Sequence, residues 1–130
     1  MRKIERRMVA AIKAMKNFHS GNTAVVIETT QHEKRALVAL HGNRIAEVYV
    51  DGTVKVTLAG WPTVTTRSRV NAILRNFVAE GANGFQANVF QAKGDQFVFA
   101  HFRHAPTLDV GYLDAATWLT FDADGYRVAG

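Results

Sequence analysis

The chain has 130 residues, of which 48% are hydrophobic, and a formal net charge of +5. This size allows one domain, over residues 1–130, whose core needs no cofactor, and the absence of cysteine excludes disulfides, thiolate catalysis and cysteine-ligated zinc. Residues 1–75 carry thirteen Lys and Arg against five Asp and Glu, whereas residues 76–130 carry three against six. We therefore expect a nucleic-acid or acidic partner at the first part of the chain, unless the charge serves solubility alone.

The first predicted element is an amphipathic helix over residues 2–16. Its apolar side chains recur at helical spacing and are expected to dock on a sheet: Ile4, Met8, Ala11, Ile12 and Met15. Another face is cationic and is a candidate phosphate-binding surface: Arg2, Arg6, Lys13 and Lys16. The helix lacks Trp and Phe, and the chain shows neither a run of about 18 apolar residues nor a secretory signal. We therefore predict no membrane partner and expect the protein in the cytoplasm.

In residues 24–58 the apolar side chains recur at every second position, and turn signals follow at short intervals. This pattern is typical of an antiparallel meander. The predicted strands are Ala24–Glu28, Arg35–Leu40, Arg44–Val50 and Thr53–Leu58. Asp51-Gly52 is the strongest turn signal, because Asp-Gly supplies the positive φ angles that a two-residue hairpin requires. In the preceding turn, His41-Gly42-Asn43, the simplest role for Asn43 is to supply a left-handed backbone angle.

A turn at Trp61-Pro62 leads into a second predicted helix, over about Thr66–Glu80. Thr65 or Thr66 is expected to cap this helix, and its core face is expected to hold Val70, Ile73, Leu74 and Phe77. We expect Arg69, Arg75 and Asn76 to point away from the core. Because a helix start has free N–H groups and Arg67 and Arg69 add positive charge, the segment predicts an anion site. The alternative is an ordinary capped helix start in contact with solvent.

A second hairpin is predicted from Phe85–Ala92 and Gln96–Phe102, with its turn at Lys93-Gly94-Asp95, and a short final pairing from Thr117–Phe121 and Tyr126–Val128. Phe97 and Phe99 share one strand face and are expected in the core, with Phe102 on the other face. His101 and His104 would lie on opposite faces of a strand, and the turn at residues 122–125 lacks the later acidic ligand of a calcium loop. We therefore predict no metal site.

The candidate ligand site combines the turn at residue 41 with the start of the second helix. Its predicted residues are His41, Asn43, Arg44, Trp61, Thr65, Thr66, Arg67 and Arg69, supplemented by the cationic face of the first helix. A base or nucleotide could stack on Trp61 while the arginines contact phosphate. The alternative role for Trp61 is to pack against the edge of the core.

Several short motifs of this chain resemble a known group of proteins. The motifs are Gly21-Asn22-Thr23, Leu40-His41-Gly42-Asn43 followed by Ile45-Ala46, and Gly60-Trp61 followed by Thr63, Thr65-Thr66, Arg69 and Asn71-Ala72. This pattern, which covers most of residues 1–78, resembles small proteins encoded by tailed bacteriophages, to which no activity is assigned. The resemblance implies a phage origin and expression in the host bacterial cytoplasm, and it supplies no catalytic residues.

The sequence as a whole predicts an α+β domain, in which an antiparallel sheet of about six strands carries two helices on one face. We expect a non-enzymatic phage accessory protein that binds nucleic acid, a nucleotide or another phosphate-rich ligand through the basic edge. The alternative is a protein-interaction module that inhibits a host enzyme or defence complex. An exposed sheet surface would also allow a homodimer. A third alternative is an enzyme in which His41 acts as acid or base, but the motif around His41 contains no carboxylate to pair with it.

Overall fold

The computed structural model describes residues 1–78, 86–101, 109–123 and 125–128 of the chain. These residues form two helices and ten strands. In chain order they are α1 (Lys3–Ala14), β1 (Phe18–Ser20), β2 (Thr23–Thr29), β3 (Lys34–Leu40), β4 (Asn43–Tyr49), β5 (Val54–Val56), α2 (Val64–Phe77), β6 (Gln86–Ala92), β7 (Asp95–His101), β8 (Asp109–Tyr112), β9 (Leu119–Asp122) and β10 (Gly125–Val128).

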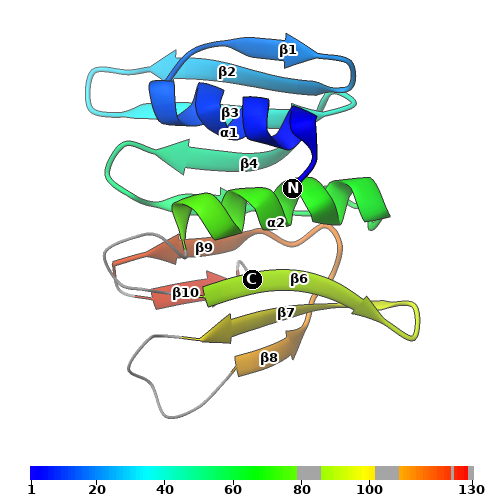
Figure 1. Ribbon diagram of the computed structural model, residues 1–130. Coiled ribbons are helices and arrows are strands. Elements are labelled where there is room, and N and C mark those ends of the chain that lie inside the picture. The colour runs from blue at the N-terminus through cyan, green and yellow to red at the C-terminus, as the bar shows by residue number, and fades with distance from the viewer. Residues whose placement is uncertain (79–85, 102–108, 124, 129–130) are drawn as a thin grey trace.

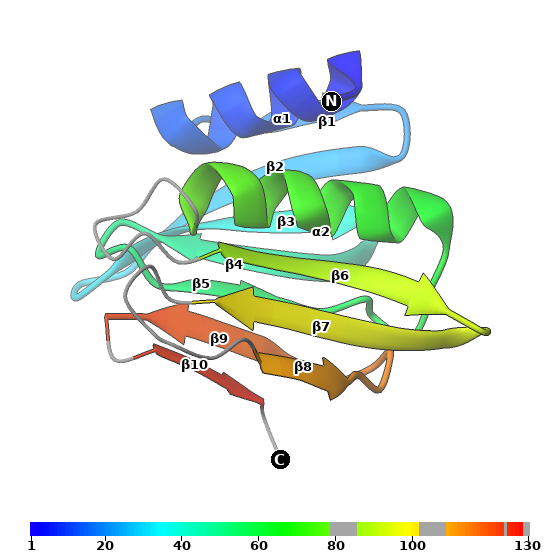
Figure 2. The same cartoon turned by 60° about the horizontal axis from the view of Figure 1, so that its bottom comes forward.

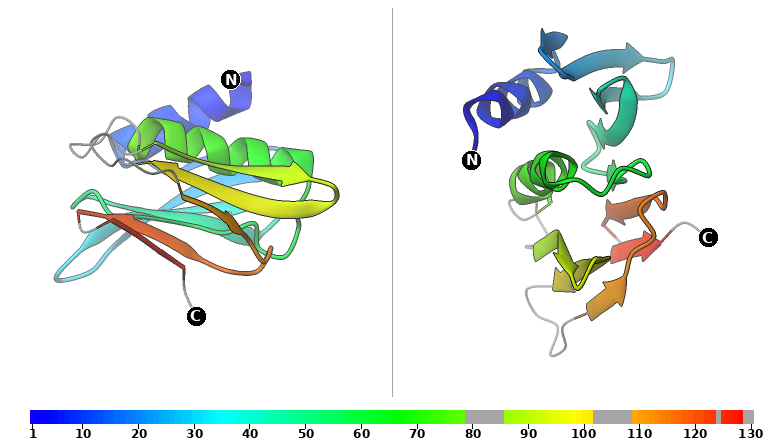
Figure 3. Two further views of the ribbon diagram at one scale, coloured as in Figure 1. Left: turned by 90° about the horizontal axis from the view of Figure 1, so that it is seen from below. Right: turned by 90° about the vertical axis from the view of Figure 1, so that its right-hand side faces the viewer.

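The strands form two antiparallel sheets. The large sheet has seven strands in the order β1-β2-β3-β4-β5-β9-β10, and the small sheet has three in the order β6-β7-β8. Both helices and the small sheet lie side by side against one face of the large sheet (Figures 1 and 3). The α+β prediction with two helices on one sheet face is therefore confirmed. The predicted single sheet of about six strands is instead a sheet of seven strands and a separate sheet of three among the described residues.

The chain leaves the large sheet after β5 and returns to the same edge. It passes through α2 and the small sheet, and then β9 pairs with β5 in the register Val54↔Phe121 and Val56↔Leu119. The inward-facing side chains of both strands are buried there. This return explains why α2 and the small sheet cover the half of the large sheet that α1 leaves open (Figure 2).

The core fills the space between the large sheet and the layer that covers it. Met8 and Ile12 of α1 and Val70, Ile73 and Leu74 of α2 are buried in one hydrophobic cluster. These residues recur at the three- and four-residue spacing of one helix face, as the sequence predicted. The apolar stripe of the first helix therefore docks on a sheet, where it faces β1 and β2.

The side chain of Asn71 on α2 completes the outer edge of the small sheet. Its Oδ1 accepts a hydrogen bond of 2.7 Å from the Val89 N–H, and its Nδ2 donates one of 2.9 Å to the Val89 carbonyl. The amide thus acts in place of a neighbouring strand, which satisfies both backbone groups of Val89. This pair fixes β6 against α2.

Phe97 and Phe99 do not lie in the core, so that prediction is wrong. The buried residues of β7 are Gln96, Val98 and Ala100, and the two phenylalanines lie on the opposite, outward face. The period of two was correct, but the small sheet packs its shorter side chains against the rest of the molecule, so the rings face outward. Phe85, Phe102 and Glu80, which the sequence analysis also assigned, lie outside the described residues.

The two-residue turn lies at residues 41–42 and not at the predicted Asp51-Gly52. Leu40 pairs with Asn43, so the two-residue turn is His41-Gly42, and its φ angles are 52° and 77°. Asn43 begins β4 and does not supply the left-handed angle. At the predicted Asp51-Gly52 hairpin, only Gly52 has a positive φ, of 97°, and the Tyr49 N–H donates to the Thr53 carbonyl across a three-residue loop.

The segments β1 and β8 were not predicted. They have three and four residues, which is too short for an alternating pattern to be recognised against its surroundings. α2 begins at Val64, two residues before the predicted start. This shift moves the helix cap, which lies beside the candidate site.

Candidate functional site

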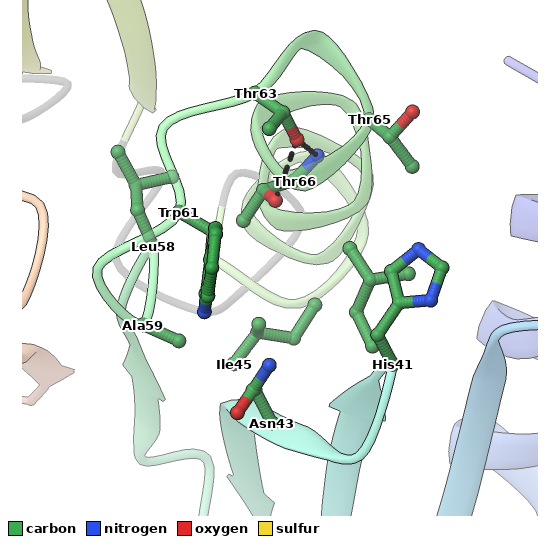
Figure 4. Close-up of a pocket in the computed structure, with 10 residues that line it drawn as sticks. His41, Asn43, Ile45, Leu58, Ala59, Trp61, Thr63, Thr65 and Thr66 are labelled. Atoms are coloured by element: carbon green, nitrogen blue, oxygen red, sulfur yellow. Dashed lines mark hydrogen bonds between the residues drawn. The ribbon is translucent and has the colours of Figure 1, made fainter.

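A pocket of about 520 Å³ lies where the β3–β4 turn meets the loop from β5 to α2 (Figure 4). It is lined by Leu40, His41, Asn43, Ile45, Leu58, Ala59, Trp61, Thr63, Thr65 and Thr66. The pocket therefore brings together five of the predicted site residues from two separate stretches of the chain: His41, Asn43, Trp61, Thr65 and Thr66. We call it the Trp61 pocket.

The indole of Trp61 is exposed, with 61% of the residue accessible to solvent. It therefore does not seal the edge of the core. Its backbone is held in place, because the Trp61 N–H donates to the Leu58 carbonyl at 2.9 Å and the neighbouring Gly60 N–H donates to the Ala115 carbonyl at 2.8 Å. Figure 4 shows the indole and the His41 ring on opposite sides of the pocket, with Ile45 between them. The pocket thus has an aromatic wall, an apolar floor and a polar rim.

The start of α2 is capped by Thr63, not by Thr65 or Thr66. The Thr63 Oγ1 accepts a hydrogen bond of 3.1 Å from the Thr66 N–H, and the hydroxyls of these two threonines lie 2.9 Å apart. Thr66 is buried, because the helix starts earlier than predicted and turns this position inward. Thr65 remains half-buried on the pocket side. Of the two predicted caps, therefore, only Thr65 is open to a ligand.

Arg67 holds the Trp61-Pro62 turn rather than lining the pocket. Its Nη1 donates to the Pro62 carbonyl at 2.7 Å, to Gln91 Oε1 at 2.9 Å and to Gln96 Oε1 at 3.1 Å. These acceptors join the start of α2 to the β6–β7 hairpin. Arg67 consequently fixes the loop that presents Trp61.

Arg69 is buried, with 4% of the residue exposed, so the prediction that it points outward and binds a ligand is wrong. Its Nη1 lies 2.8 Å from Glu5 Oε2 on α1, and its Nε donates to Thr23 Oγ1 on β2 at 3.1 Å. A buried carboxylate needs a charged partner, and position 69 faces the junction of α1, α2 and β2 where Glu5 lies. This ion pair links both helices to the large sheet.

The pKa of Glu5 lies below the 4.5 of an unperturbed glutamate. Burial alone would raise it, but hydrogen bonds from Ser68 and Arg69 and the backbone N–H of Arg2 outweigh burial and favour the charged carboxylate. The Ser68 hydroxyl donates to Glu5 Oε2 at 2.6 Å. Glu5 therefore remains ionised, and its charge is neutralised inside the protein.

Arg44 is exposed at the start of β4, where its Nη1 lies 3.4 Å from Glu47 Oε2. The alternation of β4 and β5 places Glu47, opposite Lys55, on the face of the large sheet away from the helices. Arg44 does not line the Trp61 pocket. The residues of the predicted basic edge therefore do not form one site. The pocket contains its aromatic and polar residues, and the three predicted arginines lie elsewhere.

The exposed surface of α1 is the most cationic part of the structure described here. The cations of α1 and of the residues just before and after it are Arg2, Lys3, Arg6, Arg7, Lys13 and Lys16, and we call them the basic helix face. Among the described residues, none of the ion pairs includes any of them. The one acidic residue of this segment is Glu5, which is paired with Arg69. Lys3 and Arg7 were not among the residues predicted for the cationic face, although the charge count of residues 1–75 included them.

The described residues offer neither a metal centre nor a membrane-spanning helix. They contain no group of three or more His, Asp or Glu side chains able to hold a metal ion, and His104 lies outside them. None of their helices is long and apolar enough to cross a membrane.

The chain is similar to a known protein family. Residues 1–114 match the family model described as Kyanoviridae Gp96 protein. No curated protein and no solved structure matches the chain. The match covers both helices, most of the large sheet and the whole small sheet, and so includes both the Trp61 pocket and the basic helix face.

Proposed function

The chain belongs to the family of the Kyanoviridae Gp96 protein, and we propose that this phage protein binds nucleic acid without catalysing a reaction. The observation that carries the proposal is the basic helix face. Six exposed cations lie within residues 2–16, and the single carboxylate among those residues is buried against Arg69. Because Glu5 is neutralised internally, the positive charge of the outer face is available to an external anion.

Phosphate groups are the ligand chemistry that such a surface favours. Each cation that contacts a phosphate releases condensed counterions, so affinity falls as salt rises. The logarithm of the binding constant falls against the logarithm of the salt concentration with a slope of about −0.9 per contact for duplex and about −0.7 for single strands. This contribution is independent of sequence. The proposed activity is therefore general binding in the host bacterial cytoplasm, without base-specific recognition by α1.

The Trp61 pocket supplies a second element of the proposal. Its volume of about 520 Å³ is in the range of small-ligand sites, and an exposed indole is a stacking surface for an unpaired base or a nucleotide. The side chains of His41, Asn43 and Thr65 at the rim can form hydrogen bonds with such a group. We propose that a base enters here while phosphates contact the basic helix face.

The proposal is tested with labelled DNA and RNA by fluorescence anisotropy. We expect the double variant Arg6→Gln/Lys13→Gln to weaken binding roughly tenfold at low salt, since each exposed charge contact contributes up to about 1 kcal/mol. The control Lys34→Gln/Lys55→Gln removes the same charge from the large sheet, where Lys55 faces away from the helices. Equal losses in the two variants, or no binding by the wild type, would contradict the proposal.

A second candidate function is docking on a host protein, such as an enzyme or a defence complex. The observation that favours it is the exposed apolar pair Trp61 and Val64, at 61% and 65%, where the loop that Arg67 holds in place enters α2. A fixed, exposed tryptophan is typical of the residues that dominate protein interfaces. Affinity capture from host lysate distinguishes the candidates: a stoichiometric partner that survives nuclease treatment and is lost in Trp61→Ala favours docking.

A further inference from the structure

The outward face of the small sheet carries a group of aromatic side chains. The register places Phe90, Phe97 and Tyr112 in one row across the three strands, and Asn88, Phe99 and Val110 in the next row on the same face. The rings of Phe90 and Phe97 stack at 5.5 Å, and Tyr112 meets Phe97 edge-on at 6.2 Å. Tyr112 is 67% exposed. We call Phe90, Phe97, Phe99 and Tyr112 the aromatic face.

Two hollows connect the aromatic face with the cationic end of α1. The first, of about 320 Å³, lies between α2 and β6 and is lined by Asn71, Arg75, Gln86, Ala87, Asn88 and Phe99. The second, of about 400 Å³, lies between α1 and α2 and is lined by Met1, Arg2, Glu5, Ser68, Asn71, Ala72 and Arg75. Asn71 and Arg75 line both, so the two hollows adjoin each other across α2, and we call them together the groove.

The groove and the aromatic face lie on the same side of the molecule. In Figure 1 the two helices and β6, β7 and β8 form the layer in front of the large sheet, and Figure 3 shows the same layer from the side. Asn88 and Phe99, which line the groove, are paired neighbours on the outward face of β6 and β7. A ligand that leaves the groove beside Phe99 therefore continues onto the aromatic face.

The charge of the groove is positive at its α1 end. Arg2 and Arg75 are both exposed there, together with the first residue of the chain. Glu5 is the one carboxylate that lines either hollow in the part of the chain described, and it is buried and paired with Arg69. A ligand on this path thus meets cations first, then side-chain amides, and then stacked rings.

A ligand that suits this path must combine anionic groups with flat apolar faces. Single-stranded nucleic acid has both, because its unpaired bases stack on aromatic side chains while its backbone follows basic residues. In a duplex the base faces are stacked on one another and cannot reach a protein surface. An acidic peptide would supply the charge but no series of flat rings. The order of charge, amide and ring therefore favours the unpaired strand.

We propose that this protein binds single-stranded nucleic acid along the groove, with phosphates at Arg2 and Arg75 and bases stacked on Phe99 and the rest of the aromatic face. The proposal rests on the nucleic-acid-binding function proposed above and names the form of nucleic acid that it takes. The amides of Gln86 and Asn88 lie between the two ends and can form hydrogen bonds with base edges.

The test compares single-stranded oligothymidylate of about 16 nucleotides with a duplex of the same length, and uses the variant Phe99→Leu. Leucine keeps an apolar side chain on the strand but removes the ring. We expect Phe99→Leu to weaken single-strand binding about tenfold and to leave duplex binding unchanged, because only unpaired bases stack on the ring. The control Tyr49→Leu removes a half-buried ring from β4, whose alternation places it on the opposite face of the large sheet. It should leave single-strand binding unchanged, and circular dichroism confirms that both variants fold.

The outcomes separate this proposal from the general function. If the wild type binds both forms equally and Phe99→Leu has no effect, nucleic-acid binding stands and the aromatic path is overturned. If Tyr49→Leu weakens binding as much as Phe99→Leu, the effect is not local and the path is again overturned. If the wild type binds neither form at low salt, both proposals fail.

Discussion

The substitution Arg69→Met tests whether the ion pair between α1 and α2 holds the fold together. The change removes the 2.8 Å contact with Glu5 and the 3.1 Å hydrogen bond to Thr23, and it leaves an ionised carboxylate that is only 2% exposed. Removing one partner of a buried pair costs about 3–5 kcal/mol. A domain of this size has roughly 5–15 kcal/mol in total, so the loss is a substantial part of the stability of the protein.

The assay is urea and thermal unfolding followed by circular dichroism. At roughly 3–4 °C per kcal/mol for a chain of this length, we expect Arg69→Met to lower Tm by about 10–20 °C. The exposed Arg75→Met on the same helix should change stability by less than about 0.5 kcal/mol. The double variant Glu5→Gln/Arg69→Met should be more stable than Arg69→Met alone, because it leaves no buried charge. An Arg69→Met protein within 1 kcal/mol of the wild type would refute the reasoning.

Three further predictions concern the pH dependence, the helix cap and the pocket. The folded pKa of Glu5 is lower than 4.5, so its contribution to the free energy of unfolding is complete above that pH and declines as pH falls through the folded value. Urea titrations should show that the wild type loses stability more steeply at acid pH than Glu5→Gln does, and parallel curves would contradict this. Thr63→Ala should cost about 1 kcal/mol and Thr65→Ala much less, since Thr63 caps α2; the reverse order would restore the original assignment. Ala59 has a φ of 56°, so Ala59→Gly should stabilise the protein by up to about 1 kcal/mol in thermal melts, and a loss would show that its methyl group matters more than its backbone angle.

Local patterns in the sequence were sufficient for most of the secondary structure. The stripe of α1, with Met8 and Ile12, depends only on spacing within one helix, and the structure buries both residues. The hairpins of β3–β4 and β6–β7 follow from turn residues and alternation. Both features are set by residues close in the chain, and this is why they could be predicted.

The contacts between distant segments could not be predicted in the same way. Arg69 meets Glu5 across 64 positions of the chain, and no local pattern tells an inward arginine from an outward one. The same holds for Phe97 and Phe99, whose shared face was identified but whose direction depends on how the small sheet packs. The return of β9 to β5 is a pairing of the same non-local kind.

The candidate site was predicted in part for the same reason. The Trp61 pocket joins His41 to Trp61 as expected, because both belong to turns at one end of neighbouring strands. The arginines were assigned to it by sequence proximity, yet each contacts another part of the protein: Arg44 with Glu47, Arg67 with the β6–β7 hairpin and Arg69 with Glu5. The positive charge available to a ligand lies on α1 instead.

The salt dependence of nucleic-acid binding tests the central claim most directly. The logarithm of the binding constant is measured against the logarithm of salt concentration for the wild type, Arg6→Gln/Lys13→Gln and Lys34→Gln/Lys55→Gln. We predict a steep negative slope for the wild type, a slope that is shallower by about 1.4–1.8 for the first variant and no change for the second. A slope near zero, or the same slope in all three proteins, would contradict binding through the basic helix face.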